Sequence, residues 1–151
     1  MSSGEAPKRA EVSFGGVTPV LHVRELAASI DYYVRRLGFK VVFQTPQFAS
    51  VVRGKCGIFL SEGDQGHTGS WVWIGVDDAD ALHEQLRASG AKIRHEPTNY
   101  TWAYEMQVED LDGNVLRIGS EPKRDQPLGE WLDMRGERWL PLPEGRWRRK
   151  G

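Results

Sequence analysis

The chain contains one structural pattern twice. Each copy consists of a short strand, a helix that ends at a glycine, and further strands, over residues 18–61 and 71–120. The alignment pairs Val23-Arg24-Glu25-Leu26 with Val76-Asp77-Asp78-Ala79, and Leu37-Gly38-Phe39 with Ser89-Gly90-Ala91, with a single-residue gap between the two blocks. A unit this small buries little surface alone, so we expect one joint fold, with a ligand site on the face that the copies share.

Hydrophobic spacing places the elements of both copies. In the first copy, residues 17–23 alternate as in a strand, and apolar side chains recur on one face of a helix over 25–37, before Gly38. Three further strands are expected at residues 40–44, 49–52 and 58–61. In the second copy we expect a strand at 70–76, a helix at 78–89, a strand that begins at Ile93, and a hairpin of 104–108 and 115–118.

Three regions follow from this reading. Residues 1–14 are polar and small, and we expect a flexible N-terminal tail. Residues 15–120 form the repeated domain, with modules at 17–62 and 70–120. Residues 121–151 contain four prolines and three widely spaced tryptophans, and they are interpreted as a C-terminal arm.

Composition excludes several classes of function. The chain has 151 residues and a net charge of −1, which does not support a nucleic-acid partner. The one cysteine, Cys56, cannot form an intramolecular disulfide. The sequence shows neither a secretory signal nor a stretch long enough to cross a membrane, so we expect a cytoplasmic protein without a membrane partner.

Several short motifs resemble a known family. They are Pro19-Val20-Leu21, Arg36-Leu37-Gly38-Phe39, Phe48-Ala49-Ser50-Val51-Val52, Ile58-Phe59-Leu60-Ser61, Trp71-Val72-Trp73, Tyr100-Thr101-Trp102 and Asp110-Leu111-Asp112-Gly113-Asn114. Together with the repeat, they resemble the vicinal oxygen chelate superfamily of glyoxalases, extradiol dioxygenases and bleomycin resistance proteins, and most of all the last. The resemblance implies an α+β fold of two βαβββ modules that form a curved half-barrel sheet with a ligand groove, and a homodimer that shares the groove.

The resemblance also implies where a metal would be held. Metal-dependent members place His, Glu or Gln at four strand positions, which correspond here to Thr18, Phe59, Trp71 and Arg117. None of these is a usual ligand of a transition metal, and a guanidinium that stays protonated repels a cation. The four histidines show no ligand spacing. We therefore predict no metal and no other cofactor.

Aromatic side chains supply the alternative site. Inward-facing parity and neighbouring positions select a set of ligand-binding candidates: Phe48, Phe59, Trp71, Trp73, Tyr100, Trp102, Tyr104 and Arg117. Aromatic walls with few polar groups suit a flat heteroaromatic or amphiphilic ligand. Arg117 either pairs with an acidic ligand group or with an internal carboxylate such as Glu105. The competing interpretation is that the aromatic residues only form the core.

The hypothesis favoured by these residues is a protein that sequesters a small molecule, such as a glycopeptide antibiotic, and has no catalytic residues. One alternative is an enzyme, either a metal-dependent lyase, isomerase or dioxygenase or a metal-free variant that uses Arg117, Tyr104 or His22. Another is a scaffold protein that acts through its arm. In a homodimer, Trp131 and Trp139 of the arm are expected to anchor the partner chain.

Overall fold

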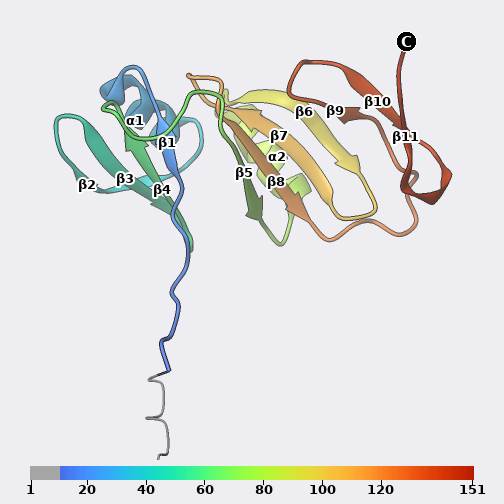
Figure 1. The fold of residues 1–151 in the computed structure, drawn as a ribbon, viewed down its shortest axis with the longest axis horizontal. Helices are drawn as coiled ribbons and strands as arrows, with labels where there is room; N and C mark the ends of the chain where they lie inside the picture. Colours follow the sequence, from blue (N-terminus) through green and yellow to red (C-terminus); the bar gives the residue numbers. More distant parts are fainter. Residues whose placement is uncertain (1–10) are drawn as a thin grey trace, which may run out of the picture.

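A computed structural model of the chain describes residues 11–151 (Figure 1). Residues 1–10 of the expected tail lie outside this range. Residues 11–18 are exposed and have no regular secondary structure. No helix within the described range is long and apolar enough to span a membrane.

The first module is a βαβββ unit. Its elements are β1 (Val20–His22), α1 (Leu26–Arg35), β2 (Lys40–Gln44), β3 (Phe48–Arg53) and β4 (Cys56–Ser61). The sheet order is β1-β4-β3-β2, with β1 parallel to β4 and the other pairs antiparallel. The first strand is shorter than predicted, because only its last residues pair with β4.

The second module repeats this topology. Its elements are β5 (Trp71–Gly75), α2 (Ala79–Ala88), β6 (Lys92–Asn99), β7 (Tyr104–Glu109) and β8 (Val115–Ser120). The sheet order β5-β8-β7-β6 matches that of the first module, strand for strand. The predicted α+β fold of two βαβββ modules is therefore confirmed.

Local sequence explains where the helices begin and end. Gly38 and Gly90, which follow α1 and α2, have φ angles of 78° and 81°, a region that glycine enters without steric cost. The Asp78 side chain accepts a hydrogen bond from the Ala81 N–H (3.0 Å) at the start of α2. At the start of α1 that role falls to Glu62, which accepts from the Leu26 N–H (2.8 Å).

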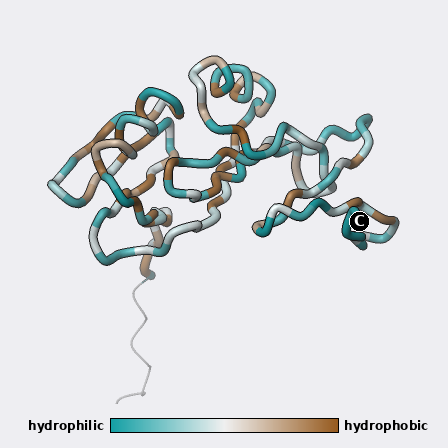
Figure 2. Tube along the Cα trace, turned by 90° about the horizontal axis from the view of Figure 1, so that it is seen from above, coloured by the Kyte–Doolittle hydropathy of each residue, from teal (hydrophilic) through white to brown (hydrophobic). Residues whose placement is uncertain are grey.

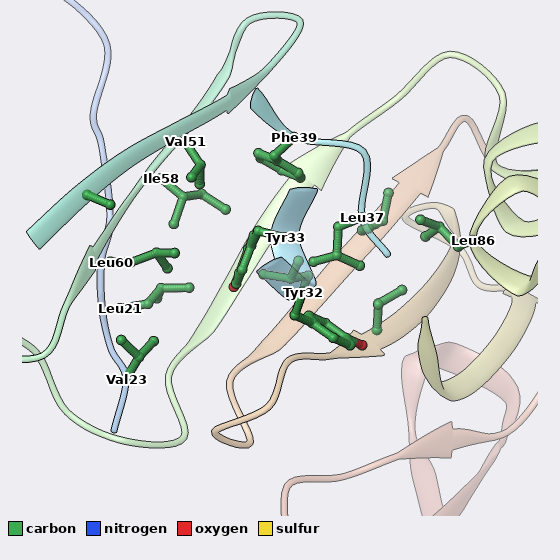
Figure 3. Close-up of a cluster of buried hydrophobic side chains, with 14 of the residues drawn as sticks. Leu21, Val23, Tyr32, Tyr33, Leu37, Phe39, Val51, Ile58, Leu60 and Leu86 are labelled. Carbon is green, nitrogen blue, oxygen red and sulfur yellow. The ribbon is translucent and has the colours of Figure 1, made fainter. Parts of the chain in front are cut away.

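One hydrophobic core joins the two modules. It contains side chains of α1 and of strands from both sheets, with Leu86 of α2 (Figure 3). Tyr33 of α1 is fully buried, and its hydroxyl donates to Asp110 Oδ2 (2.9 Å) in the second module. The Tyr32 hydroxyl donates to the Glu109 carbonyl (2.7 Å). Because a buried polar group needs a partner, these bonds fix how the modules meet.

The arm is a small antiparallel sheet and not a third copy of the module. It consists of β9 (Trp131–Leu132), β10 (Arg138–Pro141), a short 3₁₀ turn (Pro143–Gly145) and β11 (Trp147–Arg149), in the order β11-β10-β9. Its chain carries short apolar stretches between hydrophilic ones (Figure 2).

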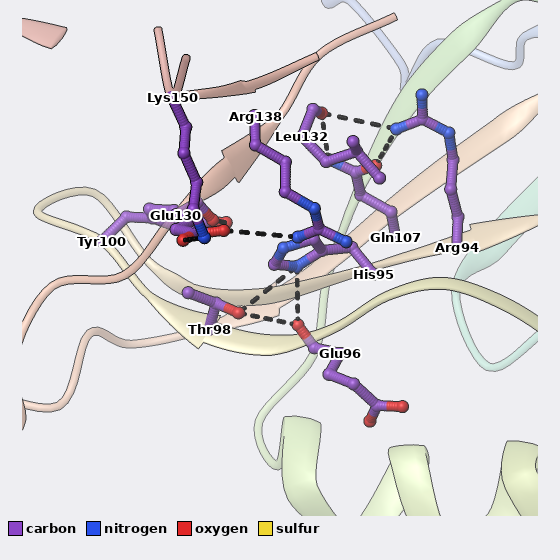
Figure 4. Close-up of polar contacts among 10 residues, drawn as sticks. All are labelled: Arg94, His95, Glu96, Thr98, Tyr100, Gln107, Glu130, Leu132, Arg138 and Lys150. Carbon is purple, nitrogen blue, oxygen red and sulfur yellow. Dashed lines mark hydrogen bonds and ion pairs between the residues drawn. The ribbon is translucent and has the colours of Figure 1, made fainter. Parts of the chain in front are cut away.

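The arm lies against the second module of its own chain. Gln107 Nε2 donates to the Leu132 carbonyl (2.9 Å), and Tyr100 Oη donates to the Glu130 carbonyl (2.6 Å) (Figure 4). Arg94 donates to the Leu132 and Asp133 carbonyls. These bonds engage the main chain of residues 130–133, so the start of the arm is held independently of its tryptophan side chains.

Candidate functional site

The predicted aromatic residues form two separate groups within one chain. Phe48 and Phe59 lie together on the first sheet, with ring centroids 5.2 Å apart, and Phe43 joins them at 5.9 and 6.4 Å. We call these three residues the phenylalanine cluster. Within the described part of the chain, no aromatic pair links this cluster to the rings of the second module.

The second group lies on the face of the second sheet opposite α2. Trp102 stacks on Tyr100 with centroids 4.8 Å apart and planes 5° from parallel. The Trp131 ring of the arm meets Trp102 edge-on, with centroids 5.9 Å apart. It is tilted relative to Trp71, with centroids 6.2 Å apart. Trp147, also of the arm, lies 6.1 Å from Trp102. The arm therefore supplies rings that interleave with those of the module.

An ion pair lies at the base of this second group. Arg117 Nε and Nη2 donate to the two carboxylate oxygens of Glu105 at 3.0 and 2.8 Å. The Glu105 side chain is only 1% exposed, whereas that of Arg117 is 30% exposed. Trp102 Nε1 also donates to Glu105. Of the two partners that the sequence left open for Arg117, the structure shows the internal carboxylate.

Two indole rings contact the Arg117 guanidinium. It lies 5.4 Å from the centroid of Trp73 and 5.0 Å from that of Trp131. Such contacts are favourable because the ring faces carry partial negative charge. The hydrogen bonds to Glu105 raise the pKa of Arg117 above its ordinary value, so the cation is permanent.

The structure does not bring Tyr104 to this face. Its hydroxyl donates to Asp80 Oδ1 (2.6 Å) of α2, and Lys123 Nζ lies 4.2 Å from its ring. Burial, and then the Asp80 carboxylate, raise the pKa of Tyr104 to about 12. Sequence analysis grouped Tyr104 with Trp102 as ligand-binding candidates, but the structure separates the two side chains, because β7 begins at Tyr104 and Trp102 lies in the turn before it.

A cavity of about 590 Å³ opens between the second module and the arm. Its lining residues are Trp102, Arg117, Trp131, Asp133, Trp139 and Trp147. Sequence reasoning missed Trp131, Trp139 and Trp147 as site residues and assigned the first two to a partner chain. The available signal was the spacing of three tryptophans in an otherwise polar arm.

A larger cavity, of about 850 Å³, lies between the modules beside α2. Its walls are mainly aliphatic, with Leu82 and Ile74 among them. Of its polar groups, Arg53 and Gln85 bond to one another (2.7 Å). The tryptophan-lined cavity offers a ligand both aromatic rings and the Arg117 cation, and we therefore regard it as the candidate site.

The four positions that hold a metal in related folds do not fit one here. Thr18 is exposed ahead of β1, and Phe59 belongs to the phenylalanine cluster. The Trp71 ring contacts Trp131 and the Arg94 guanidinium. Arg117 places a cation at a position where a metal ligand would stand. Among residues 11–151, no three His, Cys, Asp or Glu side chains gather to hold a metal ion. That the protein carries none remains a prediction.

Comparisons with known proteins agree with this fold. A model of the Glyoxalase/Bleomycin resistance protein/Dioxygenase superfamily matches residues 17–118. The bleomycin-binding protein of bleomycin-producing Streptomyces verticillus, solved with copper(II)-bleomycin, is 26% identical; the match covers 75% of this chain and 100% of that one, with a TM-score of 0.59.

Two further solved structures show the same fold. TnmS3, an antibiotic binding protein from Streptomyces sp. CB03234, is 20% identical over 75% of this chain and 100% of its own, with a TM-score of 0.64. TioX from Micromonospora sp. ML1 is 21% identical over 71% of this chain and 99% of its own, with a TM-score of 0.59. Comparison with curated protein sequences gives no match.

Proposed function

This chain belongs to the glyoxalase, bleomycin resistance protein and dioxygenase superfamily, and we propose that it binds a flat aromatic or amphiphilic small molecule without transforming it. The observation that carries this proposal is Arg117, which stands at a metal-ligand position of the fold, paired with Glu105 and flanked by indole rings. A site built this way holds a ligand by stacking and desolvation and uses neither a metal nor another cofactor.

The exposed aromatic rings support a binding role. Trp73 and Trp102 are 49% and 45% exposed, although each lies beside other rings or a cation. Large apolar side chains left open next to a cavity are typical of ligand-binding surfaces. A residue that served only the core would be covered, as Tyr33 and Leu60 are.

The solved relatives guide the choice of ligand. Two of them are a bleomycin-binding protein and an antibiotic binding protein. We therefore propose an antibiotic-like ligand for this chain, with bleomycin as one candidate. The net charge of −1 gives the protein no strong overall attraction for a cationic glycopeptide.

We further propose a homodimer. The phenylalanine cluster lies on the open face of the first sheet, and Phe43 is 47% exposed. A second copy that covers this face would place both aromatic groups in one groove, which a single chain keeps apart. Light scattering at micromolar concentration tests this: a mass of twice the chain supports it, and a monomer contradicts it.

The binding proposal is tested by calorimetry and elemental analysis on the full chain. Copper(II)-bleomycin and anthraquinone-2-carboxylate serve as ligands, and we expect at least one to bind with one-to-one stoichiometry to each chain. Trp73→Ala is expected to weaken that binding about tenfold while the unfolding midpoint changes little. One metal ion per chain that survives dialysis, or the absence of heat with both ligands at millimolar concentration, would contradict the proposal.

A further inference from the structure

We propose that the arm completes the ligand site. Trp131, Trp139 and Trp147 of the arm, with Trp102 of the module, form what we call the tryptophan enclosure, with Arg117 at its base. We infer that it takes a planar aromatic ring that bears a hydrogen-bond acceptor, a carboxylate or carbonyl, directed at Arg117. This inference rests on the proposed binding function and names where the ligand lies and what chemistry it carries.

The geometry of the rings leaves space for a planar guest. Trp102 has Tyr100 stacked on one face, while Trp131 and Trp147 meet it at angles of 73° and 51°. Rings inclined in this way bound a cavity and do not close on one another. Trp139 lines the same cavity, and its Nε1 donates to Asp133 Oδ2 (2.8 Å), which fixes the ring as a wall.

The polar groups of the enclosure favour an acceptor on the ligand. Arg117 uses Nε and Nη2 for Glu105, and Nη1 has no hydrogen-bond partner among the described residues. The Asp133 carboxylate accepts from Trp139 and from the Arg135 and Glu137 N–H groups, at 2.8 to 2.9 Å. Its bonds are made within the arm, so the unused donor of Arg117 is the polar group that a ligand can satisfy.

The bonds that attach the arm to the second module are distinct from the tryptophan side chains that line the enclosure. Gln107 and Tyr100 hold the main chain at Leu132 and Glu130. Trp147 takes no part in those bonds, and the Trp139 side chain bonds only within the arm. Truncating either tryptophan therefore removes a wall of the enclosure and leaves the arm attached.

Three of the four tryptophans of the enclosure lie outside the part of the chain that the family shares. The superfamily model ends at residue 118, whereas Trp131, Trp139 and Trp147 follow it. The three solved relatives are matched over 99–100% of their own length but cover only 71–75% of this chain. We infer that the arm gives this protein a ligand specificity of its own.

The experiment measures the dissociation constants of three planar probes by calorimetry. They are anthraquinone-2-carboxylate, the neutral 2-(hydroxymethyl)anthraquinone and the cationic proflavine. We expect the carboxylate to bind most tightly, and Trp139→Ala and Trp147→Ala each to weaken it at least tenfold. Met134→Ala is the matched control, because Met134 lies in the arm, is 75% exposed and does not line the cavity.

A second measurement follows the ligand on the wild-type chain. The chain has six tryptophans, so nitrogen-15 labelling of the indoles gives six N–H signals, assigned by Trp→Phe replacements. We expect anthraquinone-2-carboxylate to shift the signals of Trp102, Trp131, Trp139 and Trp147. Conservative Trp147→Phe replacement keeps a ring and is expected to retain more affinity than Trp147→Ala.

Each contrary result has a distinct meaning. If Trp73→Ala weakens binding while Trp139→Ala and Trp147→Ala do not, and the arm indole signals stay in place, the protein binds ligands but the arm is not part of the site. If proflavine binds more tightly than the carboxylate, the ligand class inferred from Arg117 is wrong. If the wild-type chain binds none of the three probes and no copper(II)-bleomycin, this inference and the proposed function both fail.

Discussion

The two modules place opposite chemistry at equivalent positions of the same sheet. In the first module, Phe59 pairs with Val20 of β1 and with Ser50 of β3. In the second, Arg117 pairs with Trp73 of β5 and with Gln107 of β7. Counting two residues back from the β3 and β7 partners gives Phe48 in one module and Glu105 in the other. Where the first module has two phenylalanine rings in contact, the second module thus has an ion pair.

This difference agrees with the position of the arm, which covers the face of the second sheet and leaves the face of the first sheet open. Phenylalanine rings need burial alone, and any apolar surface, such as that of a second copy, can supply it. A buried carboxylate and guanidinium need matched partners, because desolvating a charge without one is costly. The second face supplies Trp102 as a further donor to Glu105, and Trp131 of the arm as a ring over Arg117. The ion pair of the second sheet is thus covered by side chains that match it in charge and hydrogen bonding.

The largest effect is expected from breaking the ion pair. Glu105→Leu leaves the Arg117 guanidinium without its counter-ion and should lower the free energy of unfolding by about 3 kcal/mol. This value is at the lower end of the range for buried pairs, because the Arg117 side chain is 30% exposed. Adding Arg117→Met removes the orphaned charge and should recover most of that loss. Denaturant unfolding of wild type, of the single variants Glu105→Leu and Arg117→Met, and of the double variant gives the coupling energy.

The equivalent change in the first module serves as the control. Phe48→Leu shortens an apolar side chain without exposing a charge, and about 1 kcal/mol is expected. A loss for Phe48→Leu as large as that for Glu105→Leu would show that the two faces depend on packing alone. The comparison between the modules would then be one of shape and not of charge.

A smaller effect is expected at Gly119. A Cβ at this position would lie 2.6 Å from the Trp73 ring and 2.8 Å from the Glu105 Cβ, so Gly119→Ala forces both to move. About 1–3 kcal/mol of stability should be lost. The first module has Ser61 at the equivalent position, where Val20 replaces the tryptophan.

Ser61→Ala tests whether that contrast is specific to the second module. Its hydroxyl accepts from the Gly63 N–H (3.2 Å), so removing it should cost only about 0.5–1 kcal/mol. Thermal unfolding compares the two variants. Equal losses at Ser61 and Gly119 would contradict the idea that the tryptophan and the ion pair crowd the second sheet.

The contact between the modules should respond to pH. Burial raises the pKa of Asp110 above 3.8 despite its hydrogen bonds to Asn114, Asp112 and Tyr33. Because the folded state holds this proton more tightly than the unfolded state, the contribution to stability is complete below pH 3.8 and is lost as the pH rises through the folded pKa.

Asp110→Asn removes this titration. The difference in unfolding free energy between wild type and variant should therefore change as the pH rises from 3.8 through the folded pKa of Asp110, and be constant at higher pH. At pH 7 the variant should be less stable by about 1 kcal/mol, since one amide oxygen cannot replace two carboxylate oxygens. Denaturant unfolding from pH 3.5 to 8 checks it, and a difference that does not vary with pH would show that Asp110 is not the titrating group.

Much of the fold follows from the sequence, and the reasons are local. The repeat makes Phe59 of the first module equivalent to Arg117 of the second, and the strand registers agree with this equivalence. Gly38 and Gly90 end their helices as predicted, because the φ angles there suit glycine. Apolar periodicity and glycine positions are properties of neighbouring residues, so they can be read from the chain without knowledge of its tertiary contacts.

The candidate site was only partly predictable, because it depends on contacts between distant residues. Strand parity predicted Trp73 and Arg117 on one face, and Glu105 was recognised as a possible partner. The same argument failed for Tyr104, since the strand begins at that residue. The arm has strands of two to four residues and no periodic signal, so nothing in its sequence indicated that residues 130–133 bind the second module.

The smallest effect on stability, yet a clear effect on assembly, is expected in the phenylalanine cluster. Phe43→Ser replaces a ring that is 47% exposed in the single chain, so the free energy of unfolding of the monomer should change by no more than about 0.5 kcal/mol. If a second copy covers this face, losing one of its central rings should shift the mass from dimer towards monomer. Light scattering on wild type, Phe43→Ser and the control Met134→Ala measures that shift. A dimer that persists unchanged in Phe43→Ser would show that the open face of the first module is not where two chains meet, and the contrast between a face covered by its own arm and a face covered by a partner would no longer hold.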